Sequence, residues 1–173
     1  LSGGGTLGYF HLGVLKALIG QGLCPAVISG ASAGAFVAAI VGTRTDEEFL
    51  ALFEDNYLAR ALTANPDNIK IGFGSKKSID MEAVKREMQR LIPDMTFLEA
   101  YQHTNRILNI TVSPADSHQF PRLLNYLTAP NVLVRRAALA SAAIPGIFPP
   151  VQLRAKNFEG KSVAYMPQSH WID

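Results

Sequence analysis

The chain has 173 residues, of which 48% are apolar and 17% charged, a composition typical of one globular domain with a core of its own. The formal net charge is only +2 and no run of lysine and arginine is interleaved with aromatic residues, so we expect no nucleic-acid partner. The single cysteine, Cys24, excludes an internal disulfide framework and a cysteine metal site, and the longest apolar stretch, residues 31–41, is shorter than the about 20 residues that span a bilayer.

The N-terminal segment predicts the end of a buried strand, then a glycine loop, then a helix. Leu1 stands directly before the loop at residues 2–8, whose adjacent glycines disfavour regular structure. Apolar residues then recur at helical spacing over residues 9–20. Because the first residue looks internal and Asp173 closes another apolar run, we expect residues 1–173 to be a domain core that continues at both ends.

The rest of the chain alternates between strands and helices. Buried or alternating apolar runs predict strands over residues 26–29, 107–112, 122–128, 162–166 and 170–172. Helical spacing and capping boxes predict helices over residues 35–41, 45–61, 78–91, from 96 onward, and 132–143. Residues 65–77 are expected to form a loop. This alternation predicts an α/β layered fold with a mainly parallel sheet.

Residues 30–34 match the G-x-S-x-G pattern of a nucleophile elbow, with Ser32 at the centre. Such an elbow needs small flanking residues because the backbone approaches itself closely, and here every flanking residue is glycine or alanine. A strand is predicted before the pattern and a helix after it, and the helix N-terminus favours negative charge near the serine. Ser32 is therefore predicted to be a nucleophile, and the alternative is a turn that serves packing alone.

The loop glycines Gly3, Gly4 and Gly5 favour the catalytic interpretation. Acyl transfer needs N–H donors aimed at the oxyanion, and hydrolases with a nucleophile elbow often take a donor from an upstream glycine loop. Dinucleotide binding competes with this interpretation, because Gly3-x-Gly5-x-x-Gly8 matches G-x-G-x-x-G. That motif expects an acidic residue about 20 positions further on. No Asp or Glu precedes Asp46, which argues against a dinucleotide.

The residues alone leave the base that activates the serine open. A serine hydroxyl needs a neighbouring base, and histidine is the usual one. The order of an α/β-hydrolase can be built from Asp94 or Asp116 with His118 or His170. None of the four histidines stands in a recognisable turn motif: His11, His103, His118 and His170.

Four segments together resemble the patatin-like phospholipases: residues 2–8, 30–34, 140–148 (Ala-Ser-Ala-Ala-Ile-Pro-Gly-Ile-Phe) and the terminal Trp-Ile-Asp. They run from one end of the chain to the other, so the resemblance covers essentially all of it. The Thr-Leu-Gly that closes the glycine loop is most similar to the triacylglycerol-lipase branch of the family. The resemblance implies a three-layer patatin-like α/β fold, in which helices flank a mainly parallel central sheet.

The resemblance also assigns roles within the site. Patatin-like enzymes use a Ser–Asp dyad without histidine, which implies Ser32 as the nucleophile and Asp173 as the residue that orients and deprotonates it. The amides of Gly3–Gly5 would form the oxyanion hole. The family's aspartate is followed by glycine, whereas this chain ends at Asp173. Leu7 stands where many phospholipase members carry Lys or Arg, which favours neutral acylglycerols as substrates.

The expected reaction is hydrolysis of a carboxylic ester of an acylglycerol or phospholipid through an acyl-enzyme, without metal or cofactor. An acyl chain needs an apolar slot near the serine, and the candidates to line it are Phe36, Ile40, Ile147 and Phe148. A lipid substrate implies contact with a membrane or lipid-droplet surface inside the cell, and residues 65–78 are a candidate flap toward it. The alternatives are a non-catalytic lipid- or nucleotide-binding module of the same fold and a Ser–His esterase or thioesterase. The sequence leaves the oligomeric state open.

Overall fold

The structure is a computed structural model that describes residues 1–54, 86 and 88–173. Its helical elements are η1 (Gly5–Tyr9, a 3-10 helix), α1 (Phe10–Gly20), α2 (Ala33–Gly42), α3 (Asp46–Ala51), α6 (Phe97–Thr104) and α7 (Val134–Ser141). Its strands are β1 (Val27–Gly30), β2 (Ile107–Pro114), β3 (Arg122–Leu124), β4 (Arg154–Lys156), β5 (Ser162–Ala164) and β6 (Trp171–Ile172). The expected loop at residues 65–78 and most of the expected helix at residues 78–91 lie outside the described residues.

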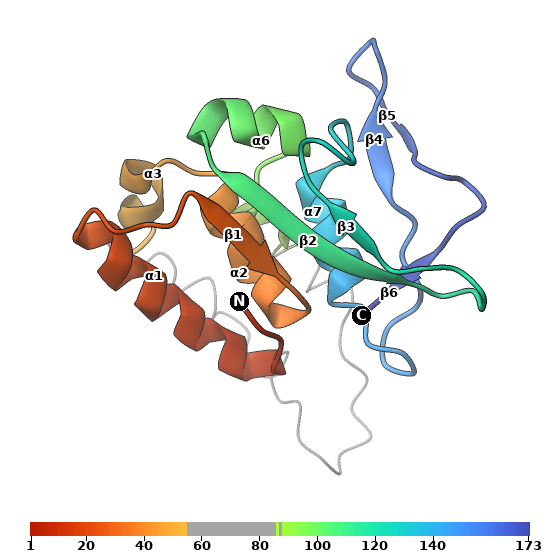
Figure 1. Ribbon diagram of the computed structural model, residues 1–173, viewed down its shortest axis with the longest axis horizontal. Helices are drawn as coiled ribbons and strands as arrows, with labels where there is room; N and C mark the ends of the chain where they lie inside the picture. The colour runs from red at the N-terminus through yellow and green to blue at the C-terminus, as the bar shows by residue number, and fades with distance from the viewer. Residues whose placement is uncertain (55–85, 87) are drawn as a thin grey trace.

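β2 is the central strand of the main sheet (Figure 1). β1 pairs with β2 in parallel, whereas β3 and β6 pair with it antiparallel. β4 and β5 form a separate antiparallel pair. The α/β class, with a sheet flanked by helices, is confirmed. The sheet itself is mixed, because β1 and β2 are the one parallel pair among the described strands.

The lengths of the connections explain why the sheet is mixed where a mainly parallel one was expected. A crossover between parallel strands needs about a dozen residues or more. Only residues 115–121 separate β2 from β3, whereas α2, α3 and α6 lie between β1 and β2. On the other side of β1, the Leu1 nitrogen donates to the Ser29 carbonyl oxygen at 2.7 Å and the Ala31 N–H to the Leu1 carbonyl oxygen at 3.2 Å. These two bonds follow the pattern of a parallel neighbour, so Leu1 lies beside β1 as a strand end would.

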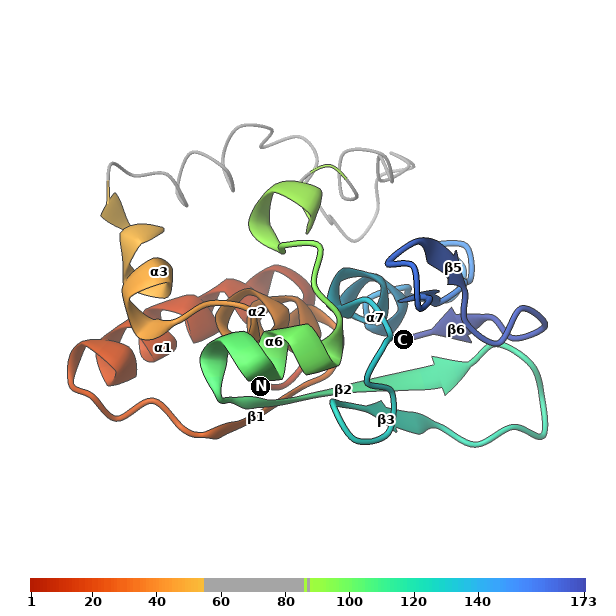
Figure 2. The ribbon, with the colours of Figure 1, turned by 90° about the horizontal axis from the view of Figure 1, so that it is seen from above.

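The described helices cover one face of the sheet. Figure 2 shows α2, α6 and α7 on the same side of β1, β2 and β3. The side chains of Ile28, Leu108 and Ile110 are buried, and they alternate along the strands with residues of the other face. On that other face Val27 is 54% exposed and Leu123 is 47% exposed. The described residues place no helix there, so they do not form the third layer of the expected fold.

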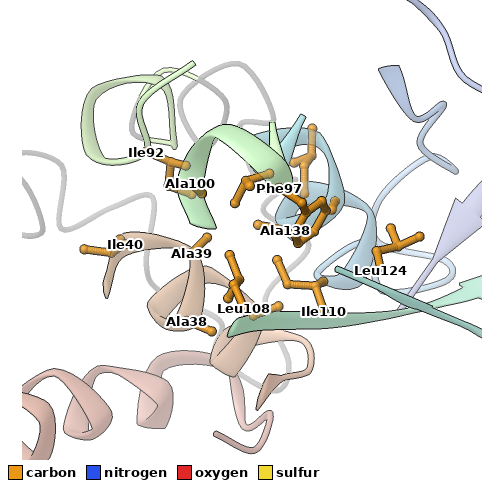
Figure 3. Packing of buried hydrophobic residues seen from close by; sticks show 14 of the residues in the cluster. Ala38, Ala39, Ile40, Ile92, Phe97, Ala100, Leu108, Ile110, Leu124 and Ala138 are labelled. Atoms are coloured by element: carbon orange, nitrogen blue, oxygen red, sulfur yellow. The ribbon is translucent and has the colours of Figure 1, made fainter. Parts of the chain in front are cut away.

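α2 is the central helix of the core. All but two of its ten residues are buried, and most of its side chains are small or β-branched. Gly42 lies so close to β2 that a Cβ there would stand 2.9 Å from a methyl carbon of Leu108. Ala39 of α2, Phe97 of α6 and Ala138 of α7 meet Leu108 over the sheet (Figure 3). Close packing on β1 and β2 fixes the N-terminal end of α2, where the candidate site lies.

Candidate active site

Ser32 stands at the sharp turn between the end of β1 and the start of α2. Its backbone has φ 51° and ψ −126°, and it is the N-cap residue of α2. A positive φ strains a residue other than glycine by about 1–3 kcal/mol, and such strain is concentrated at functional sites. The side chain of Ser32 is partly exposed. The strand–turn–helix context that the G-x-S-x-G pattern predicts is therefore present.

The glycine loop lies directly against this turn. A Cβ placed on Gly3 would stand 2.9 Å from Ser32 Cβ, and one placed on Gly34 would stand 2.2 Å from the Leu1 carbonyl oxygen. Side chains at either position would push the loop and the elbow apart. Gly4 and Gly5 turn the chain with φ of 139° and 56°, which glycine adopts without strain. The glycines of the two motifs thus bring two segments about 30 residues apart into contact.

The backbone amides of Gly3, Gly4 and Gly5 have no hydrogen-bond acceptor among the described residues. The Gly4 carbonyl accepts from the Leu7 N–H at 3.1 Å. Amides that stand without a partner beside a serine are suited to bind an oxyanion. The third glycine of the dinucleotide-like pattern, Gly8, packs instead on the elbow, where a Cβ would stand 2.7 Å from Ala33 Cβ.

Asp173 lies next to Ser32 although 141 positions separate them, and the Ser32 hydroxyl donates to Asp173 Oδ2 at 2.5 Å. The preceding strand β6 holds the aspartate in place. Trp171 is fully buried and exchanges two backbone hydrogen bonds with Val151 at 2.8 and 2.9 Å. The Asp173 N–H then donates to the Ala143 carbonyl at 3.0 Å. The side chain of Asp173 is thus exposed, and it follows two positions after the buried side chain of Trp171.

The histidines are occupied elsewhere or lie on the surface. His11 Nε2 is 3.0 Å from the Ser2 carbonyl oxygen, and His103 Nε2 is 2.7 Å from Glu48 Oε2. His118 and His170 are exposed. In the described residues, which include all four histidines, the hydroxyl of Ser32 bonds to Asp173 alone. The geometry therefore favours an Asp partner over a His partner.

Comparison with known families shows which family the chain belongs to. The model of the family described as patatin-like phospholipase matches residues 1–173. The chain belongs to the patatin-like phospholipase family. The first of the four segments that resembled the family forms the loop beside Ser32, the second forms the elbow and the last carries Asp173.

The patatin-like chain has fungal relatives that are much longer. A patatin-like phospholipase domain-containing protein of Yarrowia lipolytica is 42% identical over 178 residues, covering 100% of this chain and 22% of the relative. Another of that description from Cryptococcus neoformans is 44% identical over 165 residues, covering 92% of this chain and 19% of the relative. The chain thus spans about a fifth of the length of these relatives. Among solved structures, the type III effector protein ExoU matches with a TM-score of 0.48 and 21% identity, covering 85% of this chain and 40% of that one.

The four residues expected to line an acyl slot lie in different surroundings in this patatin-like domain. Phe36 and Phe148 are half-buried and pack against the core, and Ile147 is 47% exposed. Ile40 has no exposed surface and belongs to the core itself (Figure 3). It lies eight positions after Ser32, about 12 Å along α2 at 1.5 Å per residue. The acyl slot stays a prediction.

Sequence reasoning missed one residue that contacts Ser32. The Ser32 backbone N–H donates to Ser141 Oγ at 3.0 Å, and Ser141 is 2% exposed at the end of α7. The sequence contains one indication of Ser141: it lies in the segment at residues 140–148, which resembles the family. No role in the site was predicted for that segment.

A separate cavity of about 270 Å³ lies at the opposite end of α7 and does not include Ser32. Arg135, Arg136 and Arg154 line it together with Asp94, which bonds to Arg135 at 2.6 Å. Burial, followed by the charges of Arg154 and Arg135, lowers the pKa of Arg136.

Within the described residues no group of three or more His, Cys, Asp or Glu side chains is placed to hold a metal ion. No helix among the described residues is long and apolar enough to cross a membrane.

Proposed function

We propose that the chain is the catalytic core of a serine lipid acyl hydrolase in which Ser32 and Asp173 form a dyad. The observation that carries the proposal is the 2.5 Å hydrogen bond from the Ser32 hydroxyl to Asp173, at a strained elbow on which the glycine loop packs. The amides of Gly3–Gly5 in that loop have no acceptor among the described residues. Membership of the patatin-like phospholipase family supports a lipid-ester hydrolase.

The proposed reaction has two acyl-transfer steps. Asp173 takes the proton of the Ser32 hydroxyl as Oγ attacks the ester carbonyl carbon, and the amides of Gly3–Gly5 stabilise the oxyanion. The tetrahedral intermediate collapses, and the leaving alcohol departs with the proton that Asp173 returns. A water molecule then attacks the acyl-enzyme, Asp173 takes its proton, and the fatty acid leaves as the proton returns to Ser32. The dyad ends each cycle as it began.

We propose a neutral acylglycerol as the substrate, met at a membrane or lipid-droplet surface. Leu7, at the glycine loop, is 65% exposed and brings no cation to the site that would attract a phosphate. Phe10 and Val14 follow at helical spacing and are 74% and 56% exposed. An exposed apolar stripe next to an active-site loop favours contact with lipid. Release of fatty acid from trioleoylglycerol emulsions, compared with phosphatidylcholine vesicles, tests this preference.

Covalent labelling tests the dyad at its nucleophile. A fluorophosphonate reacts with an activated serine, so we expect mass spectrometry of the intact protein to find one adduct, on Ser32. Ser32→Ala should remove the adduct and ester turnover together. A native protein that takes up no more probe than Ser32→Ala would instead support a non-catalytic lipid-binding module.

Asparagine at position 173 tests the base. Asp173→Asn keeps the shape of the side chain but cannot accept the Ser32 proton, so kcat should fall by roughly 10²- to 10⁴-fold. His170→Gln, three positions earlier on an exposed side chain, is the matched control and should keep near-native turnover. Circular dichroism would verify that both variants fold. Loss of turnover in a folded single-histidine variant would favour a Ser–His esterase.

A further inference from the structure

The C-terminal end of α7 contacts both members of the proposed dyad. Ser141 Oγ accepts the N–H of Ser32 at 3.0 Å. Two positions further on, the Ala143 carbonyl accepts the N–H of Asp173 at 3.0 Å. These two bonds join segments that are 109 and 30 positions apart in the sequence. One short stretch of the chain, residues 141–143, therefore contacts both residues.

The hydroxyl of Ser141 accepts the backbone N–H of Ser32, which has no backbone acceptor in the described helices and strands. Ser32 is the N-cap of α2, and an N-cap N–H has no acceptor inside its own helix. The neighbouring Ala31 N–H already bonds to Leu1 and continues the sheet, so the pairing beside β1 ends one residue before Ser32. Without Ser141 the amide of Ser32 would lose its acceptor at the most strained residue of the elbow.

We propose that Ser141 is a positioning residue for the dyad. Its hydroxyl fixes the peptide that precedes Ser32 Cα, and so the direction of the Cα–Cβ bond, while the Ala143 carbonyl fixes Asp173. The end of α7 thereby holds the hydroxyl of Ser32 at hydrogen-bond distance from the carboxylate of Asp173. This inference rests on the proposed function. It also bears on the oxyanion donors, since the amide of Ser32 is committed to Ser141, whereas the amides of Gly3–Gly5 have no acceptor among the described residues.

Ser141→Ala in the intact protein tests the inference. Because small displacements of reacting groups reduce rates strongly, we expect kcat and the maximal rate of fluorophosphonate labelling to fall by about 10- to 100-fold. KM should stay within about twofold, because Ser141 is buried and touches the elbow rather than the substrate. Ser141→Thr keeps the hydroxyl acceptor and should restore much of the rate. Ser141→Cys keeps the size with a weaker acceptor, should give an intermediate rate, and decides the question if the alanine variant does not fold.

Two control variants separate positioning from general loss of stability. Ala137→Gly weakens the same helix without touching either bond, and should lower the melting temperature about as much while keeping the labelling rate. Ser162→Ala removes a hydroxyl that accepts from Arg154 in the separate β4–β5 pair, and should also keep that rate.

The possible results are distinguishable. A native protein that labels at Ser32 together with a Ser141→Ala variant that labels within twofold of it would overturn this inference and leave the proposed function standing. Equal losses in Ser141→Ala and Ala137→Gly would overturn it as well. A native protein that does not label above Ser32→Ala would remove both proposals.

Discussion

Gly3 has no room for a side chain, because a Cβ there would stand 2.9 Å from Ser32 Cβ. We expect Gly3→Ala to move the loop amides away from the elbow and to reduce kcat by about 10²-fold, the loss that removal of an oxyanion donor causes. Gly13→Ala is the matched control: it lies inside α1 with nothing within 4 Å of a new Cβ. That variant should keep its activity and gain up to about 1 kcal/mol of stability from better helix propensity. Equal activity in the two variants would contradict an oxyanion role for the loop.

Single residues differ in how far the sequence reveals them. The elbow at Ser32 and the glycine loop could be located from the sequence, because each has a fixed local pattern. Asp173 came from family resemblance, since an aspartate after an apolar run has no pattern of its own. Ser141 could not be predicted, because its contact with Ser32 joins positions 109 apart and depends on how α7 packs over β2.

At the scale of elements, the two capping boxes were predicted correctly. Thr45 with Glu48 and Thr96 with Glu99 each form both reciprocal hydrogen bonds, at the first turns of α3 and α6. β3 ends at Leu124, earlier than expected. The side-chain oxygen of Asn125 accepts the backbone N–H groups of Leu127 and Thr128 and so turns the chain. Local side-chain bonds of this kind compete with strand pairing and leave no mark on hydrophobic periodicity.

Glu99 should make the stability of α6 depend on pH. Burial raises the pKa of Glu99, but hydrogen bonds from Lys156 and from the Thr96 amide outweigh burial and lower the pKa below its ordinary value. A lowered carboxylate pKa stabilises the fold above the unfolded-state pKa, and this stability is lost as the pH falls through the folded-state pKa. Glu99→Gln keeps the capping box but removes the charge, so it should lose about 0.2–1 kcal/mol at neutral pH.

Urea unfolding from neutral to acid pH measures this effect. The difference between native protein and Glu99→Gln should shrink as the pH falls. Thr96→Ala removes the cap itself and should cost about 1 kcal/mol at neutral pH. A constant gap between native protein and Glu99→Gln across the titration would refute the ionic contribution.

At the scale of the whole molecule, Ile40 belongs to the core that α2, α6, α7 and β2 share. With no exposed surface, Ile40→Ala should destabilise the protein by about 2–4 kcal/mol and leave acyl-chain preference unchanged. Phe36, half-buried and four residues after Ser32, is the informative comparison. Denaturation and turnover of esters of graded chain length would separate the two roles. An altered chain-length preference in Ile40→Ala would restore that residue to the acyl slot.

The α/β class was predictable for the molecule as a whole, because buried strands alternate with helical segments in the sequence. The mixture of parallel and antiparallel pairing in the sheet could not be predicted from the sequence. β3 and β6 are short, and their direction depends on connections and on contacts with distant β2 rather than on their own residues. Long-range pairing of this kind is set by the packing of the complete chain.

The distance between Ser32 and Asp173 along the chain has a consequence for biosynthesis. Ribosomes add about 5–20 residues per second, so the 141 positions between the two residues take roughly 7 to 28 s to translate. Throughout that interval the residues of the elbow and the glycine loop have been added, but the proposed partner of the serine, Asp173, has not. If the proposed dyad is correct, the nascent chain therefore cannot turn over esters until Asp173 has been added and β6 has paired with β2.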